Sequence, residues 1–259
     1  GFKGFVAKWS DMASWRTDRK TGTGDIGSAL NPFRQDPLDT TLTAFNASFR
    51  NTVYYDRSGR KWSIDHSRQS DRNKSLLLNG SETRTRDADI LHLRVNATTR
   101  WTIELEAESG RNTSRSDLLG GRNWTIAQRA ARPKLTWQPN TSIRMSAQGK
   151  YTEKHNDAEG GGEKAVISSM GLEMRWNTSG KGSLQVNGDL VDITYGGTVN
   201  SALGNEMLTG LKPGLNGTWA LIIQRRLSDH LQLDLTYNGR HSLGVPITHV
   251  GGVQVRAYF

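Results

Sequence analysis

A strict alternation of apolar and polar side chains is the feature that most limits how this chain can fold. Residues 231–238 read Leu-Gln-Leu-Asp-Leu-Thr-Tyr-Asn, so every second side chain is apolar. Successive side chains of a β-strand point to opposite faces, whereas a helix would scatter both sets around its circumference. The final residues 253–259 alternate in the same way, with Val253, Val255, Ala257 and Phe259 on one face. The pattern predicts strands that each separate an apolar environment from a polar one.

Eleven segments of the chain show this alternation. Most span about ten residues or more, which is longer than the average soluble strand of about five or six residues and close to the 9–11 that a tilted membrane strand needs. Their approximate cores are 43–55, 61–69, 89–97, 101–109, 123–137, 142–152, 165–176, 183–195, 217–227, 231–239 and 249–259. Two of them change parity midway, near Ala130-Ala131 and near Leu190-Val191, and these changes predict β-bulges.

Single-chain bacterial barrels have even strand numbers, so residues 2–9 are the candidate for a twelfth strand. The predicted fold is therefore all-β: an antiparallel, up-and-down transmembrane β-barrel of about 12 strands. The alternative left open is the C-terminal part of a larger barrel, with further strands before Gly1. In the first arrangement residues 1–40 hold one strand and a long extracellular loop, and residues 41–259 hold the remaining strands.

The connections between these segments alternate between short and long, as the periplasmic turns and extracellular loops of outer-membrane barrels do. Six tryptophans fit this layout, since four lie beside the short turns and two lie where strands leave long loops. Aromatic belts occupy both boundaries of a membrane. The predicted belt consists of Trp62, Trp101, Trp124, Trp137, Trp176 and Trp219.

Composition narrows the class further. Hydrophobic residues make up 34% and the mean hydropathy is −0.63, with no run of the roughly 20 apolar residues that a membrane helix needs. A membrane barrel passes this test because only alternate residues face lipid. The net charge is +9, but 34 basic residues are dispersed among 25 acids, so no nucleic-acid partner is expected. The chain has no cysteine, which rules out disulfides.

If the apolar face meets lipid, the other face lines the interior and is densely charged. Neighbouring strands lie about 4.8 Å apart, so opposite charges can pair across them. Two interpretations remain open: a structural network that fills a narrow lumen, or a water-filled path that selects solutes. The predicted lumen-lining residues are Arg94, Glu104, Glu106, Glu108, Arg129, Lys134, Arg144, Glu173, Arg175, Asp189, Asp234 and Arg256.

Catalytic and metal-binding patterns are weak by comparison. The six histidines are scattered without a His-x-x-x-His pair, and Gly160-Gly161-Gly162 lacks the context of a phosphate-binding loop. No catalytic residue, metal or cofactor is predicted, and the protein is expected not to be an enzyme. A hydrolase at the barrel rim is the remaining catalytic alternative, with His155 or His241 as its histidine.

Residues 205–214, Asn-Glu-Met-Leu-Thr-Gly-Leu-Lys-Pro-Gly, followed by a strand from Thr218-Trp219, carry a resemblance. This stretch resembles the C-terminal barrel regions of large, mostly uncharacterised outer-membrane proteins of the Bacteroidetes. The C-terminal half is also distantly similar to the last strands of TonB-dependent transporters, although no plug domain precedes it.

The resemblance implies a bacterial outer-membrane location with a periplasmic C-terminus. It implies that Tyr258 and Phe259 signal insertion to the barrel-assembly machinery. Other expected partners are outer-membrane lipid, lipopolysaccharide, and other outer-membrane or surface proteins.

The function predicted from these observations is a structural or assembly role in the outer membrane, with surface loops that bind partners. The first alternative is a porin-like solute channel or a receptor/transporter barrel. The rim hydrolase is the less favoured alternative. A soluble β-sandwich or lipocalin-like binding protein is the rival at the level of the fold, because a soluble barrel also alternates.

Overall fold

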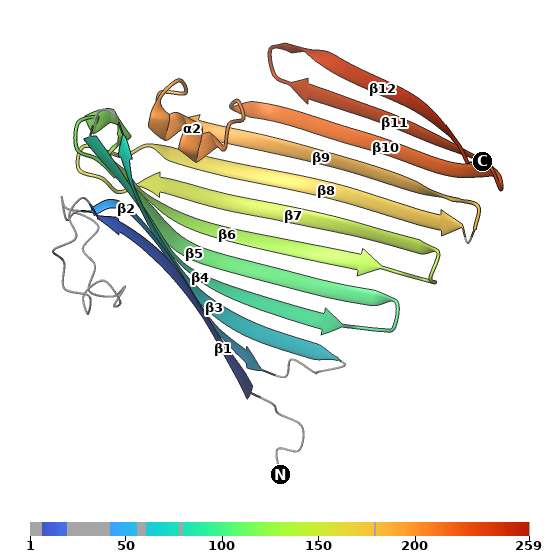
Figure 1. Ribbon diagram of the computed structural model, residues 1–259, viewed down its shortest axis with the longest axis horizontal. Helices are drawn as coiled ribbons and strands as arrows, with labels where there is room; N and C mark the ends of the chain where they lie inside the picture. Colours follow the sequence, from blue (N-terminus) through green and yellow to red (C-terminus); the bar gives the residue numbers. More distant parts are fainter. Residues whose placement is uncertain (1–6, 20–41, 56–60, 78–79, 179, 259) are drawn as a thin grey trace.

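Twelve β-strands form a single antiparallel sheet in the computed structural model of this chain, which describes residues 7–19, 42–55, 61–77, 80–178 and 180–258. Each strand pairs with the one before and after it in sequence, in the order β1 to β12 (Figure 1). The strands are β1 Ala7–Arg19, β2 Leu42–Tyr55, β3 Trp62–Leu77, β4 Gly80–Asn96, β5 Trp101–Ser116, β6 Trp124–Trp137, β7 Ile143–Asn156, β8 Lys164–Thr178, β9 Gly182–Gly196, β10 Gly214–Ser228, β11 Leu231–Ser242 and β12 Val245–Ala257.

The all-β, up-and-down arrangement of twelve strands confirms the predicted fold class. All eleven alternating segments are strands, but several run further than predicted. β3 and β4 extend through most of residues 70–88, the gap between the predicted strands 61–69 and 89–97 that was expected to be a long connection, and β5 continues to Ser116. Apart from Leu76 and Leu77, these extensions are mostly polar on both faces, and the ladder of backbone hydrogen bonds continues where the alternation has ended.

The first strand differs from its predicted position. β1 runs from Ala7 to Arg19, so residues 10–19 are strand and not the start of the long loop. Residues 1–6 and 20–41, which hold the rest of that prediction, lie outside the described residues, as does Phe259.

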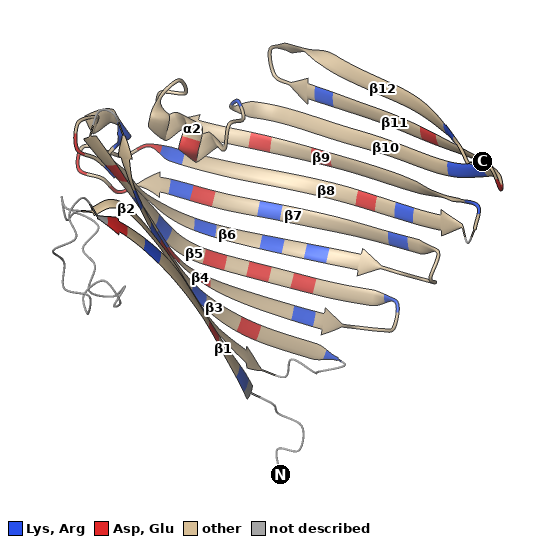
Figure 2. Ribbon diagram, viewed as in Figure 1, with Lys and Arg blue, Asp and Glu red and all other residues tan. Residues whose placement is uncertain are grey.

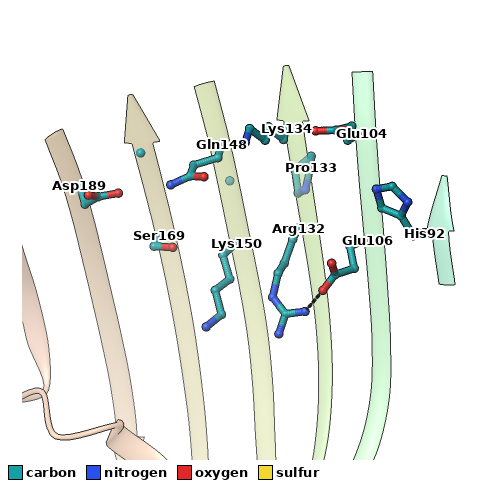
Figure 3. A pocket seen from close by; sticks show the side chains of 12 residues that line it. His92, Glu104, Glu106, Arg132, Pro133, Lys134, Gln148, Lys150, Ser169 and Asp189 are labelled. Carbon is teal, nitrogen blue, oxygen red and sulfur yellow. Dashed lines mark hydrogen bonds and ion pairs between the residues drawn. The ribbon is translucent and has the colours of Figure 1, made fainter. Parts of the chain in front are cut away.

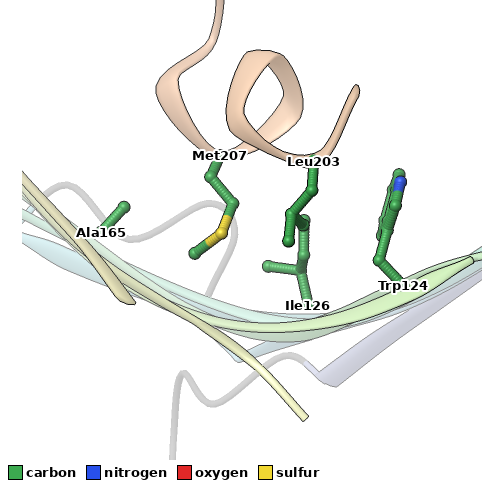
Figure 4. Close-up of a cluster of buried hydrophobic side chains, with 5 residues drawn as sticks. All are labelled: Trp124, Ile126, Ala165, Leu203 and Met207. Carbon is green, nitrogen blue, oxygen red and sulfur yellow. The ribbon is translucent and has the colours of Figure 1, made fainter. Parts of the chain in front are cut away.

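Two short helices accompany the strands in the described part of the chain: the 3-10 helix η2 (Gly120–Arg122) and α2 (Ala202–Leu208), between β9 and β10. Helix α2 was not predicted from the sequence. Figure 4 shows it on the concave side of the sheet, and this side is called the inner face below. Among the described residues, no helix has the length and apolar character to cross a membrane.

Neither predicted β-bulge exists. β6 keeps one continuous register against β5, from Trp101↔Trp137 to Ser114↔Trp124. β9 is equally continuous against β8 and β10. The hydrophobic side of these strands does change midway, because α2 covers their inner face at one end.

The sheet is open. Among the described residues β1 and β12 do not pair, and they lie at opposite ends of the curved sheet (Figure 1). The predicted twelve strands are present, whereas the closure of a twelve-strand barrel by its first and last strands is not seen.

Candidate functional site

The inner face collects almost all of the predicted lumen-lining residues. Cross-strand pairs share a face, and the pairs Arg94↔Glu104, Glu104↔Lys134 and Arg144↔Arg175 place these residues together. By the same alternation the inner face carries Arg94, Glu104, Glu106, Glu108, Lys134, Arg144, Glu173, Arg175, Asp189, Asp234 and Arg256. Arg129 was placed there wrongly: without a bulge it faces outward, opposite Glu153.

Glu108 is the centre of an ion-pair network on this face. Its side chain is 3% exposed, and it accepts hydrogen bonds from Arg86 Nη2 at 3.0 Å and Arg132 Nη2 at 2.6 Å. Gln128 Nε2 donates a third at 3.2 Å. Arg132 also binds Glu106. A buried carboxylate with three donors is stable only as part of such a network, so this region supports the structural interpretation of the lumen charges.

A second, smaller network lies nearer the long connections. Glu82 accepts from Arg84 Nε at 2.7 Å and from Arg122 Nη1 of η2 at 3.0 Å. Glu82, Arg84 and Arg86 were not predicted as lumen residues, because the predicted strand began only at residue 89 and left the first half of β4 in a long connection. Their even numbering, shared with His92 and Arg94, was the available signal.

An open pocket of about 390 Å³ lies beside the Glu108 network. Figure 3 shows it crossing several strands, with Arg132 and Lys134 in the middle, Glu104 and Glu106 on one side of them, and Gln148 and Lys150 on the other. Lys134 and Lys150 form no ion pair with any described residue, in contrast to Arg132. Charged residues of both signs recur along the neighbouring strands (Figure 2), so the inner face combines neutralised groups with cations that remain available.

Helix α2 covers the other end of the inner face. Leu203 and Met207 pack onto Trp124, Ile126 and Ala165, and Met207 and Ala165 are fully buried (Figure 4). A second cluster joins Leu208 to Ile167 and Ile193. The spacing of Leu203 and Met207, four residues apart after Ser201, matches one face of a helix, and this signal was present in the sequence.

Hydrogen bonds fix both ends of α2. Ser201 Oγ accepts from the backbone N–H of Gly204 at 2.8 Å, which caps the N-terminus. Lys154 of β7 donates from Nζ to the carbonyls of Glu206 and Met207, both at 3.0 Å. A lysine beside the last carbonyls of a helix satisfies acceptors that have no partner within the helix. The helix is therefore attached to the inner wall by apolar contacts and by a cation.

The outer face carries an apolar band. On β6 the outward residues Trp137, Leu135, Pro133 and Ala131 are apolar, and Arg129 follows them. The eight steps from Trp137 to Arg129, the first charged residue on this face, correspond to about 27 Å along a strand, or about 20 Å across a membrane after a tilt of roughly 40°. This is close to the band of about 25 Å on membrane barrels.

Five of the six predicted belt tryptophans lie on the outer face, and their positions follow a tilt. One row of Cα partners runs from Trp62, near a short connection, to Trp219, near a long one, and continues through Gly239 to His249. Between the two tryptophans the row passes through Val95, Ile103, Leu135, Ala147, Leu172 and Gly188. Because this row crosses from one border of the apolar band to the other, the strands must be tilted relative to the band. Trp124 is the exception, since it lies on the inner face under α2.

The outer face of β1–β4 is less uniform. Asp11 Oδ1 accepts from Asn51 Nδ2 at 2.6 Å and from Trp9 Nε1 at 3.1 Å. His66 lies 3.4 Å from Asp89. These polar groups stand at the height of the apolar band, and each is paired with a neighbour.

Two acids outside the strands are held in their charged form. Ser81 donates from its hydroxyl and its backbone N–H to Asp117 Oδ2, at 2.6 and 3.1 Å, which lowers the pKa of Asp117. Asn156 Nδ2 donates to Glu163 Oε2 at 2.9 Å and lowers the pKa of Glu163. Both lie near the long connections, so hydrogen bonds as well as packing order this end of the sheet.

The two histidines of the catalytic alternative are not brought together. His155 lies at the end of β7, with Nε2 3.6 Å from Asp157, and His241 lies on β11. Among the described residues no three metal-binding side chains cluster.

No protein-family model and no curated protein matches this sequence. Weak matches exist among solved structures. The translocator domain of the autotransporter NalP from Neisseria meningitidis is 12% identical with a TM-score of 0.34, covering 100% of this chain and 90% of that one. The β-domain of the Bordetella autotransporter BrkA is 10% identical with a TM-score of 0.37, covering 99% and 100%. These likenesses are too low to carry a functional argument, and the resemblance to the Bacteroidetes proteins stays a prediction.

Proposed function

We propose that this chain forms the wall of a bacterial outer-membrane β-barrel and has a structural or assembly role. Its long connections would bind partners. The observation that carries the proposal is the tilted row from Trp62 to Trp219, which joins the two borders of one apolar band. In a soluble barrel no physical boundary would favour tryptophans at two separate heights along the barrel axis on the outer surface. Outer-membrane lipid and lipopolysaccharide would contact this band.

Quenching of single tryptophans by brominated lipid tests the proposal. A variant that keeps Trp137 alone should be quenched strongly in bilayers, because Trp137 faces outward in the band. A variant that keeps Trp124 alone is the matched control and should be quenched little, since Trp124 is buried under α2. Equal quenching of both, or a protein that stays in buffer without detergent, would contradict the proposal.

Insertion is proposed to depend on the barrel-assembly machinery, with the C-terminus in the periplasm. Removing Tyr258 and Phe259 should leave the protein outside the outer-membrane fraction. A C-terminal epitope should be detected only after the outer membrane is permeabilised. Surface labelling of that epitope on intact cells would contradict this orientation.

A second candidate function is a channel for anionic solutes. It is favoured by Lys134 and Lys150, which line the inner pocket without an ion pair to a described residue. Substitution of both by glutamine should lower anion-over-cation selectivity in planar bilayers, while Arg129→Gln on the outer face should not change it. Absence of conductance would leave only the structural role.

We propose no catalytic function. His155→Ala and His241→Ala variants should behave as the unmodified chain does in lipase and protease assays, and an activity lost in either would contradict this.

A further inference from the structure

The two borders of the outer apolar band differ in charge. On β5 to β8 the outward residues at the border near the short connections are uncharged: Trp101, Trp137, Ile143 and Trp176. Toward the long connections the outward residues of the same four strands include three basic residues and a histidine: Arg111, Arg129, Lys164 and His155. Tryptophan is common at any boundary between membrane and water, whereas a basic border favours an anionic neighbour.

Three of these side chains surround Ala127 on β6. Ala127 pairs with Arg111 of β5 and with His155 of β7, and Arg129 is the next outward residue of β6. Diagonal neighbours on a sheet lie about 7–8 Å apart, which is within reach of long side chains. All three side chains belong to exposed residues, and the methyl group of Ala127 fills little of the space between them. Arg111, Arg129 and His155, called the basic cluster below, can therefore converge on one ligand.

One anion already lies beside the basic cluster. Asp157 Oδ2 is 3.5 Å from Arg111 Nη2, and Asp157 Oδ1 is 3.6 Å from His155 Nε2. These distances are long for charge-assisted hydrogen bonds, and exposed pairs of this kind contribute little. Arg129 forms no ion pair with any described residue, and Glu153 opposite it is bound by a lysine of β8. The cluster therefore shows where an anion is held and keeps a cation that its own acids do not neutralise.

We propose that the basic cluster binds the phosphate groups of a lipid in the leaflet on the long-connection side, which is lipopolysaccharide in the proposed outer membrane. This inference rests on the proposed outer-membrane function and names the site of its lipid contact. Arg129 stands about 20 Å across the membrane from Trp137, at the end of the apolar band, so it lies where lipid headgroups begin. Guanidinium groups bind phosphate oxygens through two parallel hydrogen bonds. The border near the short connections lacks such donors on these strands, so the difference between the borders assigns the phosphates to one leaflet.

Binding of a purified lipid to the full-length protein in detergent tests the proposal. The probe is lipid A, the phosphorylated lipid part of lipopolysaccharide, and native mass spectrometry measures the fraction of protein that retains it. Arg111→Gln/Arg129→Gln should weaken binding about twentyfold, since each basic residue near anionic lipid contributes about 1 kcal/mol, or about fivefold. Arg225→Gln is the matched control, because Arg225 also faces outward but lies at the border near the short connections. This control should leave binding almost unchanged.

The lipid without its phosphates separates phosphate recognition from contact with acyl chains. The unmodified protein should bind it at least tenfold more weakly than lipid A. Equal binding of the two lipids would overturn the proposal, and so would unchanged lipid A binding by the double variant or an equal loss in Arg225→Gln. Inorganic phosphate should not displace lipid A, and displacement would show a site for a free anion instead of a lipid. Failure of the membrane assignment is read separately, from quenching of Trp137 by brominated lipid, which the double variant should leave unchanged.

Discussion

The two ends of β6 place apolar side chains on opposite faces of the same sheet, buried at one end and at least partly exposed at the other. Toward the long connection Trp124 and Ile126 point inward and are covered by α2. Toward the short connection Leu135 and Trp137 point outward, and Arg132 and Lys134 occupy the inner face. β9 repeats the contrast, with Ile193 buried inward under α2 and Val186 facing outward.

This comparison shows that a change of hydrophobic parity is not by itself evidence for a bulge. Alternation shows which face of a strand lies in an apolar environment at each point along it. At one end the inner face is apolar and helix α2 covers it. At the other end the outer face is apolar, and we propose that lipid covers it. The backbone register is continuous through both.

The largest expected effect comes from placing a charge at each end of β6. Ile126→Arg should lower the unfolding free energy by about 3–5 kcal/mol, since it leaves an unpaired charge in a buried cluster, and should expose residues 197–213 to protease. Leu135→Arg should cost about 2–4 kcal/mol in bilayers and leave that segment protected. Urea unfolding in lipid vesicles and limited proteolysis measure both. Equal protease sensitivity of the two variants would break the comparison.

A methionine pair sharpens it. Met207→Ala removes a fully buried side chain and should cost about 2–4 kcal/mol, as core methionine truncations do. Met145→Ala, on the outer face, is the matched control and should cost less, because lipid can fill the space. The measurement is urea unfolding in vesicles. A larger loss of unfolding free energy for Met145→Ala than for Met207→Ala would contradict the comparison, because the tighter packing would then lie on the outer face.

A smaller effect is expected from the lysine that holds α2. Lys154→Met should cost about 1–3 kcal/mol, because the carbonyls of Glu206 and Met207 lose a charged donor. Lys150 lies on the same strand and face and has no ion-pair partner among the described residues. Lys150→Met should therefore leave the unfolding free energy almost unchanged. Thermal unfolding in detergent compares the two, and identical midpoints would argue against the attachment of α2 by Lys154.

The smallest effect concerns pH. The pKa of Glu163 is lowered in the folded protein by the hydrogen bond from Asn156, so ionised Glu163 favours the folded state. This stabilisation is fully present above the unfolded glutamate pKa of about 4.3 and is lost as the pH falls through the lower folded value. Glu163→Gln should flatten that part of the stability profile. An unchanged acid limb in this variant would assign the pH dependence to other groups.

The sequence by itself determined the strand class, the up-and-down order and the sorting of most residues to two faces. Period-two alternation is local, so residues such as Leu233 and Asp234 carry it without reference to distant parts of the chain. The same reasoning placed all but one of the twelve lumen residues and all but one of the six belt tryptophans on their observed faces.

Only the tertiary structure decided the positions of Trp124 and Arg129, the ion pairs that converge on Glu108, and the open edges of the sheet. Trp124 faces inward because α2, some eighty residues further along the chain, covers it. Arg129 faces outward because the ladder between β5 and β6 has no extra residue. Curvature depends on the twist summed over all twelve strands, and no local pattern shows whether β1 and β12 meet.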